Sequence, residues 1–138
     1  MGQKRKNMAK LGMSTTVTGS MEDVKEKVRA SLKAQGFGIL TEIDMQKTLK
    51  EKIDVDIEPY LILGACNPKI ANRALTADRS IGLLLPCNVV LRETGSSVEV
   101  SILDPEVLFS VVDGGGNADL TQLPLEAKQL LQAALDSL

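Results

Sequence analysis

Tyr60-Leu61-Ile62-Leu63-Gly64-Ala65-Cys66-Asn67-Pro68 is the stretch that decides the fold. Residues 60–65 form a continuous apolar run, which predicts a strand buried on both faces. The run ends at Asn67-Pro68; Asn is a preferred residue before the first turn of a helix, and Pro is favoured at the first helical position. Apolar residues then recur at helical spacing at Ile70, Ala71, Ala74 and Leu75. The sequence therefore predicts a buried strand that runs directly into an amphipathic helix.

Upstream of this stretch, the sequence predicts two further strand–helix pairs. Residues 15–18 favour a strand, and Ser20 can cap a helix over 21–34. A second strand follows, with one face formed by Phe37, Ile39, Thr41 and Ile43. Asp44 can cap the next helix, whose apolar stripe is Met45, Leu49 and Ile53. Residues 54–58 alternate acids with β-branched residues, and we expect them to be irregular or a short edge strand.

A hairpin and two helices are predicted downstream. Ile81 to Leu91 predicts a long strand, with Pro86 at a bulge or an unpaired edge position. A polar turn over 93–96 joins it to a strand over 98–102, in which apolar and polar residues alternate. Asp104-Pro105 opens a helix that extends to Val111. Pro124 is predicted to begin the last helix, whose apolar stripe is Ala127, Leu130, Leu131, Ala134, Leu135 and Leu138.

The resulting element order is β-α-β-α-β-α-β-β-α-α. The alternating first half permits parallel pairing, whereas the later hairpin is antiparallel. The pattern predicts an α+β fold in which helices cover a mixed or antiparallel sheet. We expect a single domain over residues 14–138 and a basic, disordered tail over residues 1–13.

The composition excludes several classes of function. The 138-residue chain has 16 basic and 18 acidic residues, and four of the basic ones lie in the tail: Lys4, Arg5, Lys6 and Lys10. The remaining residues are therefore acidic overall and repel a phosphate backbone, so no nucleic-acid partner is predicted. The absence of His excludes His-metal sites and Ser-His or Cys-His catalytic pairs.

No stretch after Lys10 resembles the apolar region of a secretory leader, and no apolar run is long enough to span a bilayer. We therefore expect a cytoplasmic protein with no membrane partner, in which Cys66 and Cys87 are reduced thiols. Two thiolates are too few for a tetrahedral zinc site, and no spacing of acids points to further ligands. No metal and no cofactor are predicted.

Two Cys-Asn dipeptides form the candidate site. Cys66 lies at the mouth of the predicted helix, where unpaired N–H groups bind anions and lower the pKa of a thiol. Cys87-Asn88 follows Pro86, where a bulge would aim either side chain away from the sheet. If the two strands lie side by side, one pocket is lined by Cys66, Asn67, Cys87 and Asn88. The alternatives are a buried Cys66 that only packs beside a helix cap, and an edge strand whose Asn88 reaches solvent.

Two other motifs have simpler interpretations. The loop Asp113–Asn117 contains three glycines but lacks both the P-loop lysine and the dinucleotide-fold spacing, so we expect a flexible connector. Glu42 and Asp44 could divide acid and base roles on one strand face. Asp44 has the simpler role of helix cap, which we favour.

Several motifs together carry a family resemblance. They are Gly36-Phe37-Gly38, Glu42-Ile43-Asp44, Gly64-Ala65-Cys66-Asn67-Pro68, Leu85-Pro86-Cys87-Asn88-Val89 and Asp104-Pro105. In this order and spacing, over about residues 14–113, the chain resembles the prokaryotic family catalogued as domain of unknown function 302. The resemblance implies a small α+β fold and a homodimer, and it implies no activity. The family pattern has a Met soon after the Asp-Pro, where this chain has Val107 and Leu108.

Three hypotheses for function follow. The first is a binding domain that docks a small anionic or polar ligand at the Cys66-Asn67-Pro68 helix start. The alternative is a thiol-dependent enzyme, or a sulfur or acyl carrier, with Cys66 as nucleophile and Cys87 as its partner. The second alternative is a dimeric structural module.

Overall fold

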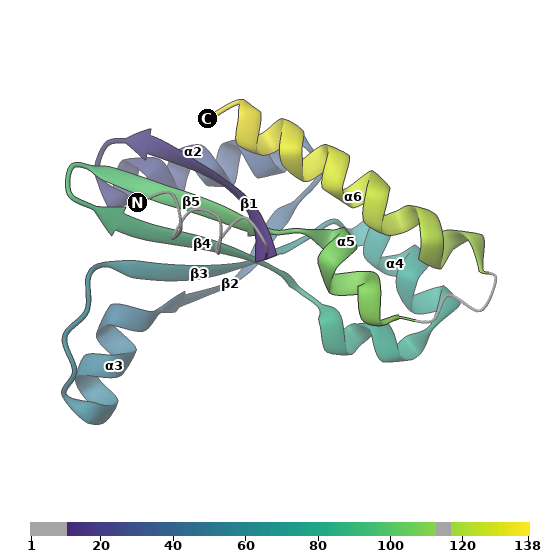
Figure 1. Ribbon diagram of the computed structural model, residues 1–138, viewed down its shortest axis with the longest axis horizontal. Coiled ribbons are helices and arrows are strands. Elements are labelled where there is room, and N and C mark those ends of the chain that lie inside the picture. The colour runs from purple at the N-terminus through teal and green to yellow at the C-terminus, as the bar shows by residue number, and fades with distance from the viewer. Residues whose placement is uncertain (1–10, 113–116) are drawn as a thin grey trace.

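The computed structural model describes residues 11–112 and 117–138, which form a five-stranded sheet with helices on one face and at both ends (Figure 1). The strands lie in the order β1-β5-β4-β3-β2, and every neighbouring pair is antiparallel. The strands are β1 (Gly12–Thr18), β2 (Gly38–Asp44), β3 (Tyr60–Cys66), β4 (Cys87–Thr94) and β5 (Ser97–Leu103).

The helices begin where the sequence places capping residues. The α-helices are α2 (Met21–Ala34), α3 (Met45–Ile53), α4 (Pro68–Ala77), α5 (Pro105–Leu108) and α6 (Ala118–Asp136). Two 3₁₀ helices, η1 (Arg79–Leu84) and η2 (Phe109–Val111), complete the described part of the chain. Side chains of Ser20, Asp44, Asn67 and Asp104 each accept a hydrogen bond from a backbone N–H in the first turn that follows. These four predicted caps are therefore confirmed.

The predicted α+β fold is confirmed, and the sheet takes the antiparallel form. β1 and β2 run in the same direction, but α2 carries the chain across the sheet between them, so they lie at opposite edges. The alternation of strands and helices in the first half therefore produces no parallel pair in this sheet.

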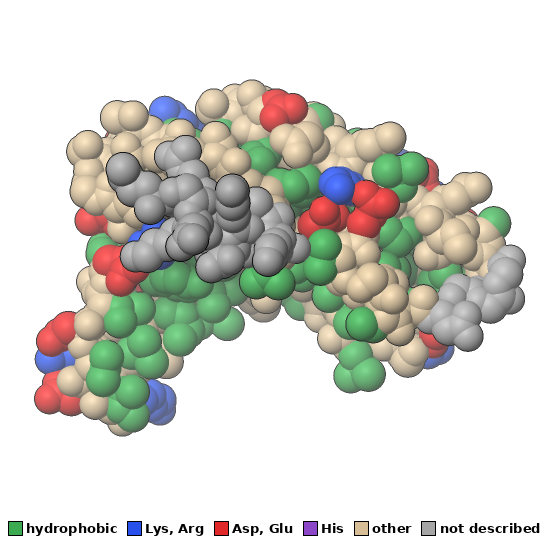
Figure 2. Space-filling view, in the orientation of Figure 1, with side chains coloured by type: hydrophobic (Ala, Val, Ile, Leu, Met, Phe, Trp, Pro, Cys, Tyr) green, Lys and Arg blue, Asp and Glu red, His purple; other side chains and the backbone are tan. Residues whose placement is uncertain are grey.

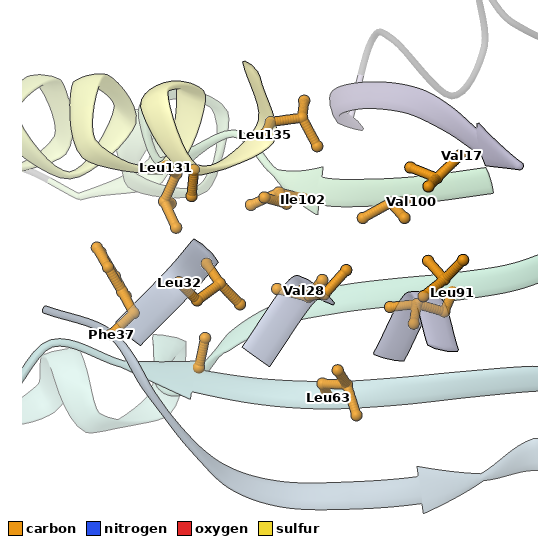
Figure 3. Close-up of a cluster of buried hydrophobic side chains, with 14 of the residues drawn as sticks. Val17, Val28, Leu32, Phe37, Leu63, Leu91, Val100, Ile102, Leu131 and Leu135 are labelled. Carbon is orange, nitrogen blue, oxygen red and sulfur yellow. The ribbon is translucent and has the colours of Figure 1, made fainter. Parts of the chain in front are cut away.

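One face of the sheet packs against α2 and the C-terminal part of α6 (Figure 3). We call this cluster the body core; its buried residues are Val17, Val24, Val28, Leu32, Phe37, Leu61, Leu63, Ala65, Val89, Leu91, Val98, Val100, Ile102, Leu131, Ala134 and Leu135. Alternate residues of β3 enter this core, while Ile62 points to the opposite face, which neither helix covers. The expectation that β3 is buried on both faces is therefore wrong, because the sheet is antiparallel and covered on one side.

A second, smaller core holds a helical lobe at one end of the sheet (Figure 1). The lobe comprises α4, η1, α5, η2 and the part of α6 that precedes Pro124. Its buried residues, which we call the lobe core, are Ala74, Ile81, Leu120 and Leu123. The two cores share no buried residue, so the described chain has a body and a lobe that pack separately.

The long strand predicted over Ile81 to Leu91 is wrong in its first half. Residues 79–84 form η1, because the Asp78 side chain accepts hydrogen bonds from the Ser80 backbone and hydroxyl at 2.9 and 2.7 Å. β4 begins only at Cys87, so Pro86 precedes the strand. A short apolar run does not distinguish a strand from a helical segment by its periodicity, which explains the error.

The last helix begins six residues before the predicted start. Asn117 caps α6 by accepting hydrogen bonds from the N–H groups of Asp119 and Leu120 at 2.9 and 3.4 Å. Pro124 therefore lies inside the helix, where it lacks the N–H that would bond the carbonyl of Leu120. The sequence pattern places Asn117 in the flexible connector Asp113–Asn117 rather than at a helix start, and residues 113–116 of that connector lie outside the described part of the chain.

A bulge in β2 overturns the predicted face of that strand. The pairing with β3 shifts register between Ile39 and Thr41, so Leu40 is an extra residue and is 67% exposed. Ile39 packs against the body core, whereas Ile43 is paired with Ile62 on the uncovered face. Phe37 and Ile39 thus face the body core, whereas Thr41 and Ile43 lie on the uncovered face of the sheet.

β1 begins at Gly12, inside the segment predicted to be a tail, and the basic residues of that tail lie among residues 1–10, outside the described chain. Residues 54–59 contain no regular element, as expected. Across residues 11–112 and 117–138, none of the helices combines the length and the apolar character that crossing a bilayer would require.

Candidate functional site

The turn from β3 into α4 is fully hydrogen-bonded. Asn67 Oδ1 accepts from the N–H groups of Lys69 and Ile70 at 3.1 and 3.2 Å, and the Asn67 carbonyl accepts from Ala71 N at 2.9 Å. Pro68, the first helical residue, has no N–H. Every donor in this first turn therefore has a partner within the chain, and the geometry does not favour the predicted anion there.

A cavity of about 60 Å³ lies beside this turn, where the body meets the lobe. β3 ends and β4 begins at this cavity, and α4, α5 and α6 surround it. Its lining residues are Phe37, Ala65, Cys66, Asn67, Ile70, Ala71, Ala74, Leu84, Leu85, Cys87, Pro105, Leu108, Phe109, Leu123, Pro124, Ala127 and Leu131. Among the described lining residues other than the two cysteines, Asn67 alone has a side chain that forms strong hydrogen bonds, so this lining is apolar.

Three of the four predicted site residues border this cavity. Cys66, Asn67 and Cys87 are among its lining residues, as the hypothesis of one shared pocket expects. Asn88 is not: it is exposed and pairs with Gly64 in the sheet, on the face opposite to Cys87. The alternative in which Asn88 reaches solvent is the one the structure shows, although β4 is an inner strand rather than an edge.

The surroundings of both thiols oppose ionisation. Desolvation by the apolar lining raises the pKa of Cys66 from its ordinary value, and it raises the pKa of Cys87 to about 12. The Cys87 thiol also donates a long hydrogen bond to the Leu103 carbonyl, with Sγ 3.7 Å from the oxygen. The expected lowering of a thiol pKa at the helix mouth is therefore wrong in direction, because Asn67 occupies the donors that would stabilise a thiolate.

The two cysteines are both free thiols. Cys87 pairs with Ala65 in the sheet, so Cys66, the next residue, is directed to the other face by the alternation of β3. Both reach the cavity because it lies at the end of the sheet. They thus border one space from different sides.

Gly64 explains why the Gly-Ala-Cys-Asn-Pro and Leu-Pro-Cys-Asn-Val motifs meet. A Cβ atom at Gly64 would collide with Thr41 Oγ1 and would lie 2.7 Å from Pro86 Cγ. The missing side chain lets Pro86 pack across β3, directly before β4 begins at Cys87. The sequence contains both motifs but gives no sign of this contact.

Two basic residues bridge the surface above the cavity. Arg73 of α4 pairs with Asp119 and Glu126 of α6, with N–O distances of 2.9 and 3.1 Å. Lys128 of α6 pairs with Asp104 and Glu106 at the start of α5, at 2.9 and 3.0 Å. Side-chain hydrogen bonds to these carboxylates raise the pKa of both Arg73 and Lys128.

No sequence pattern predicted these ion pairs. Their partners are separated by 22 to 53 positions, and no local pattern connects residues so far apart. Figure 2 shows a basic group between acidic groups where α5 meets α6. Of the lining residues that α6 contributes, Ala127 and Leu131 were predicted as part of a helical stripe, whereas Leu123 precedes the predicted helix.

The acid pair considered in the sequence has structural roles. Asp44 caps α3 by accepting from Lys47 N at 2.9 Å, as favoured. Glu42 pairs with Lys25 and Arg29 of α2 at 3.4 and 2.9 Å. Within the described ranges, no group of three or more Cys, Asp or Glu residues is placed to hold a metal ion.

Comparison with known proteins connects this geometry to a family. The family model described as "Domain of unknown function DUF302" matches residues 13–138, which include both cysteine motifs and all the elements around the cavity. The chain belongs to the DUF302 family. No curated protein matches the chain.

The DUF302 fold is shared with a solved relative. The crystal structure of an uncharacterized conserved DUF302 protein from Bacillus stearothermophilus superposes with a TM-score of 0.81 and is 27% identical in sequence. The match covers 91% of this chain and 96% of that one. The body and the lobe are thus both parts of the DUF302 domain.

Proposed function

We propose that the domain binds a small apolar molecule, or the apolar end of a larger one, in the cavity between the body and the lobe. The observation that carries the proposal is the lining: of the seventeen described lining residues, the fourteen other than Asn67 and the two cysteines all have apolar side chains. A preformed apolar space with few polar groups is typical of ligand sites. The cavity also lies where two separately packed cores meet, which is a common position for such sites.

The lining favours an apolar guest over the anion predicted from the helix start. An anion needs unpaired donors, and those of Lys69 and Ile70 are occupied by Asn67. The volume of about 60 Å³ is far below the ~300–1,000 Å³ of typical pockets for drug-sized ligands. The guest in this closed form is therefore a short chain of methylene groups or a comparably small ring.

The proposal is tested by titrating straight-chain alcohols of increasing length while recording methyl NMR spectra. Saturable shifts at Ala74 and Leu131, strengthening with chain length, are expected, and inorganic phosphate should produce none at these methyls. Ala71→Leu fills the cavity from α4 and should abolish the shifts. Ala133→Leu, on the exposed side of α6, is the matched control and should leave them unchanged. No saturable shift with any alcohol would contradict the proposal.

Thiol catalysis receives less support than binding. A nucleophilic thiol is activated by a lowered pKa, whereas burial raises the pKa of both thiols here. Alkylation of Cys66 across pH separates the two functions: the binding proposal expects a reaction no faster than that of a free thiol. A Cys66 that reacts faster at neutral pH would favour the enzyme.

A second candidate function, assembly as a homodimer, is supported by the uncovered face of the sheet. Ile43, Ile62 and Val90 lie side by side across this face, and Figure 2 shows apolar side chains continuing over β2, β3 and α3. α3 buries none of its residues fully, and Ile53 is 62% exposed. Arg92 pairs with Glu58 and Glu99 at one end of the face, which gives the apolar centre a polar border. A second copy of the chain would cover this surface with an identical one.

Sedimentation over a range of concentrations tests the homodimer. We expect Ile43→Glu to dissociate the dimer by placing a charge in the centre of the interface. Leu83→Glu is the matched control, because Leu83 is 88% exposed on the lobe and should not affect assembly. A wild-type chain that stays monomeric at every concentration would contradict the candidate.

A further inference from the structure

We propose that the helical lobe opens about Pro124 as a unit and so controls entry to the cavity. That the motion serves ligand entry rests on the function proposed above, whereas the motion itself rests on the packing of the two cores. The cavity of about 60 Å³ is too small for most ligands in its closed form, and a moving lobe would enlarge it.

The first argument is the position of the cavity between two cores. Phe37, Ala65 and Leu131 line it from the body core, while Ala74 and Leu123 line it from the lobe core. Neither core contains a buried residue of the other, so the boundary between them runs through the cavity, which the buried Pro105 and Pro124 also line. Segments with small cores open at lower free energy than the whole domain.

The second argument is the position of Pro124 in α6. Leu120 and Leu123 precede it and belong to the lobe core, whereas Leu131 and Leu135 follow it and belong to the body core. Pro124 itself lines the cavity and lacks the N–H that would strengthen the helix at this point. The one helix that spans both cores is therefore weakest where it passes between them.

The third argument is the chain path and the charges around the boundary. Apart from α6, the lobe joins the sheet at Asn67, Leu85-Pro86 and Asp104, which are residues at the ends of elements, where hinges usually lie.

Across the boundary, Arg73 of the lobe pairs with Glu126, which follows Pro124 in α6. Lys128 pairs with Glu106 of α5 in the same way. These exposed ion pairs hold the closed form and are weakened by salt.

Cys87 is half-buried and its thiol faces the cavity, where burial desolvates it, so a change in its reactivity reports the opening. In a Cys66→Ala background, the rate of Cys87 modification by a neutral aromatic disulfide measures how often the lobe opens. The rate is followed against urea concentration and compared with global unfolding measured by circular dichroism. Opening of the lobe exposes less surface than unfolding of the domain, so we expect a urea slope below half of the global one.

Substitutions at the boundary between the body and the lobe test the proposed opening of the lobe. Arg73→Gln and Lys128→Gln should each accelerate modification by about two- to threefold, as loss of an exposed ion pair allows. High salt should accelerate wild type similarly, and Pro124→Ala should slow the reaction by making α6 continuous. Lys50→Gln removes the ion pairs from α3 to Asp54 and Asp56, which follow that helix away from the cavity, and should change nothing.

A urea slope equal to that of global unfolding would overturn the proposal, since Cys87 would then be exposed only when the domain unfolds. Boundary variants whose effects match their change in global stability would overturn it as well. All of these measurements are made without ligand. If the lobe opens but no alcohol binds, the proposed function fails while the hinge stands; if alcohols bind without sub-global opening, the reverse holds.

Discussion

The body core and the lobe core differ in size and in construction. The body core consists of sixteen buried residues, which come from four strands of the sheet (β1, β3, β4 and β5), from α2 and α6, and from Phe37, whereas four buried residues hold the lobe. The body is also tied by the ladder of backbone hydrogen bonds between its strands, while the lobe consists of short helices with 3₁₀ turns. We infer from this comparison that the body provides most of the stability of the domain. The boundary between body and lobe, where the cavity lies, is the part that can move.

Truncating a leucine in each core tests this comparison with the largest expected effect. Leu63→Ala in the body should lower the free energy of global unfolding by about 3–5 kcal/mol, because Leu63 is fully buried. Leu123→Ala in the lobe should cost less, about 2–3 kcal/mol, and should mainly expose Cys87. Urea denaturation and Cys87 modification measure the two effects. Equal losses of global stability would contradict the division into two cores.

Alkaline pH should weaken the boundary through Cys87. Its pKa is about 12 in the folded chain against an ordinary value of 9.0, so the unfolded chain loses this proton first as the pH rises. The stabilising contribution of Cys87 is therefore fully present below pH 9 and is lost as the pH rises from about 9 to 12. The resulting loss in the free energy of unfolding is about 2–3 kcal/mol near pH 11. Urea denaturation at several pH values measures it.

Cys87→Ala serves as the control for this pH dependence. Lysines titrate equally in the variant and in wild type, so the difference between their stability curves isolates the thiol. Parallel curves from pH 8 to 11 would show that the Cys87 thiol is solvated in the folded chain, and the boundary would then be open rather than closed.

Adding a methyl group at Gly64 should disturb the place where β3 passes the lobe connection. Its Cβ would collide with Thr41 Oγ1 and crowd Pro86, so Gly64→Ala should destabilise the domain by about 2 kcal/mol. Gly38→Ala is a matched control on neighbouring β2, where a Cβ meets no atom within 4 Å. Thermal unfolding compares the two. A Gly64→Ala variant as stable as Gly38→Ala would show that Pro86 moves freely.

The smallest expected effects come from two helix caps. Ser20→Ala removes the cap of α2 in the body, and Asn67→Ala removes the cap of α4 in the lobe; each should cost about 1 kcal/mol of local helix stability. Hydrogen exchange should show the loss for Ser20→Ala across the body and the loss for Asn67→Ala within α4 alone. Equal spreading of both effects would indicate that body and lobe unfold together.

Local signals in the sequence predicted much of the fold. Four helix caps bind backbone N–H groups only two or three residues further along the chain, so a local sequence pattern is enough to predict them. These caps are Ser20, Asp44, Asn67 and Asp104. The errors arose where tertiary contacts decide the outcome. Nothing local distinguishes Arg79–Leu84 as a 3₁₀ helix from the first half of a strand, and Pro124 inside α6 is tolerated only through its packing.

Three of the four candidate residues meet as the shared-pocket hypothesis expects, whereas the apolar character of the space between them was not predicted. Cys66, Asn67 and Cys87 do border one cavity, because β3 and β4 lie side by side, as the hypothesis of one shared pocket requires. The apolar lining comes from helices far along the chain, including Leu123 of α6, and its desolvating effect on the thiols is a property of that assembly. A dipeptide motif contains no information about such neighbours.

The pairing of β1 with β5 has a consequence for synthesis on the ribosome. The strand that starts the sheet waits for a partner more than eighty residues away, since Gly12 pairs with Leu103. The body core also requires Leu131 and Leu135 from α6. The nascent chain therefore cannot complete its core until these residues have emerged, and premature termination before α6 leaves an apolar sheet face for chaperones or proteases to recognise.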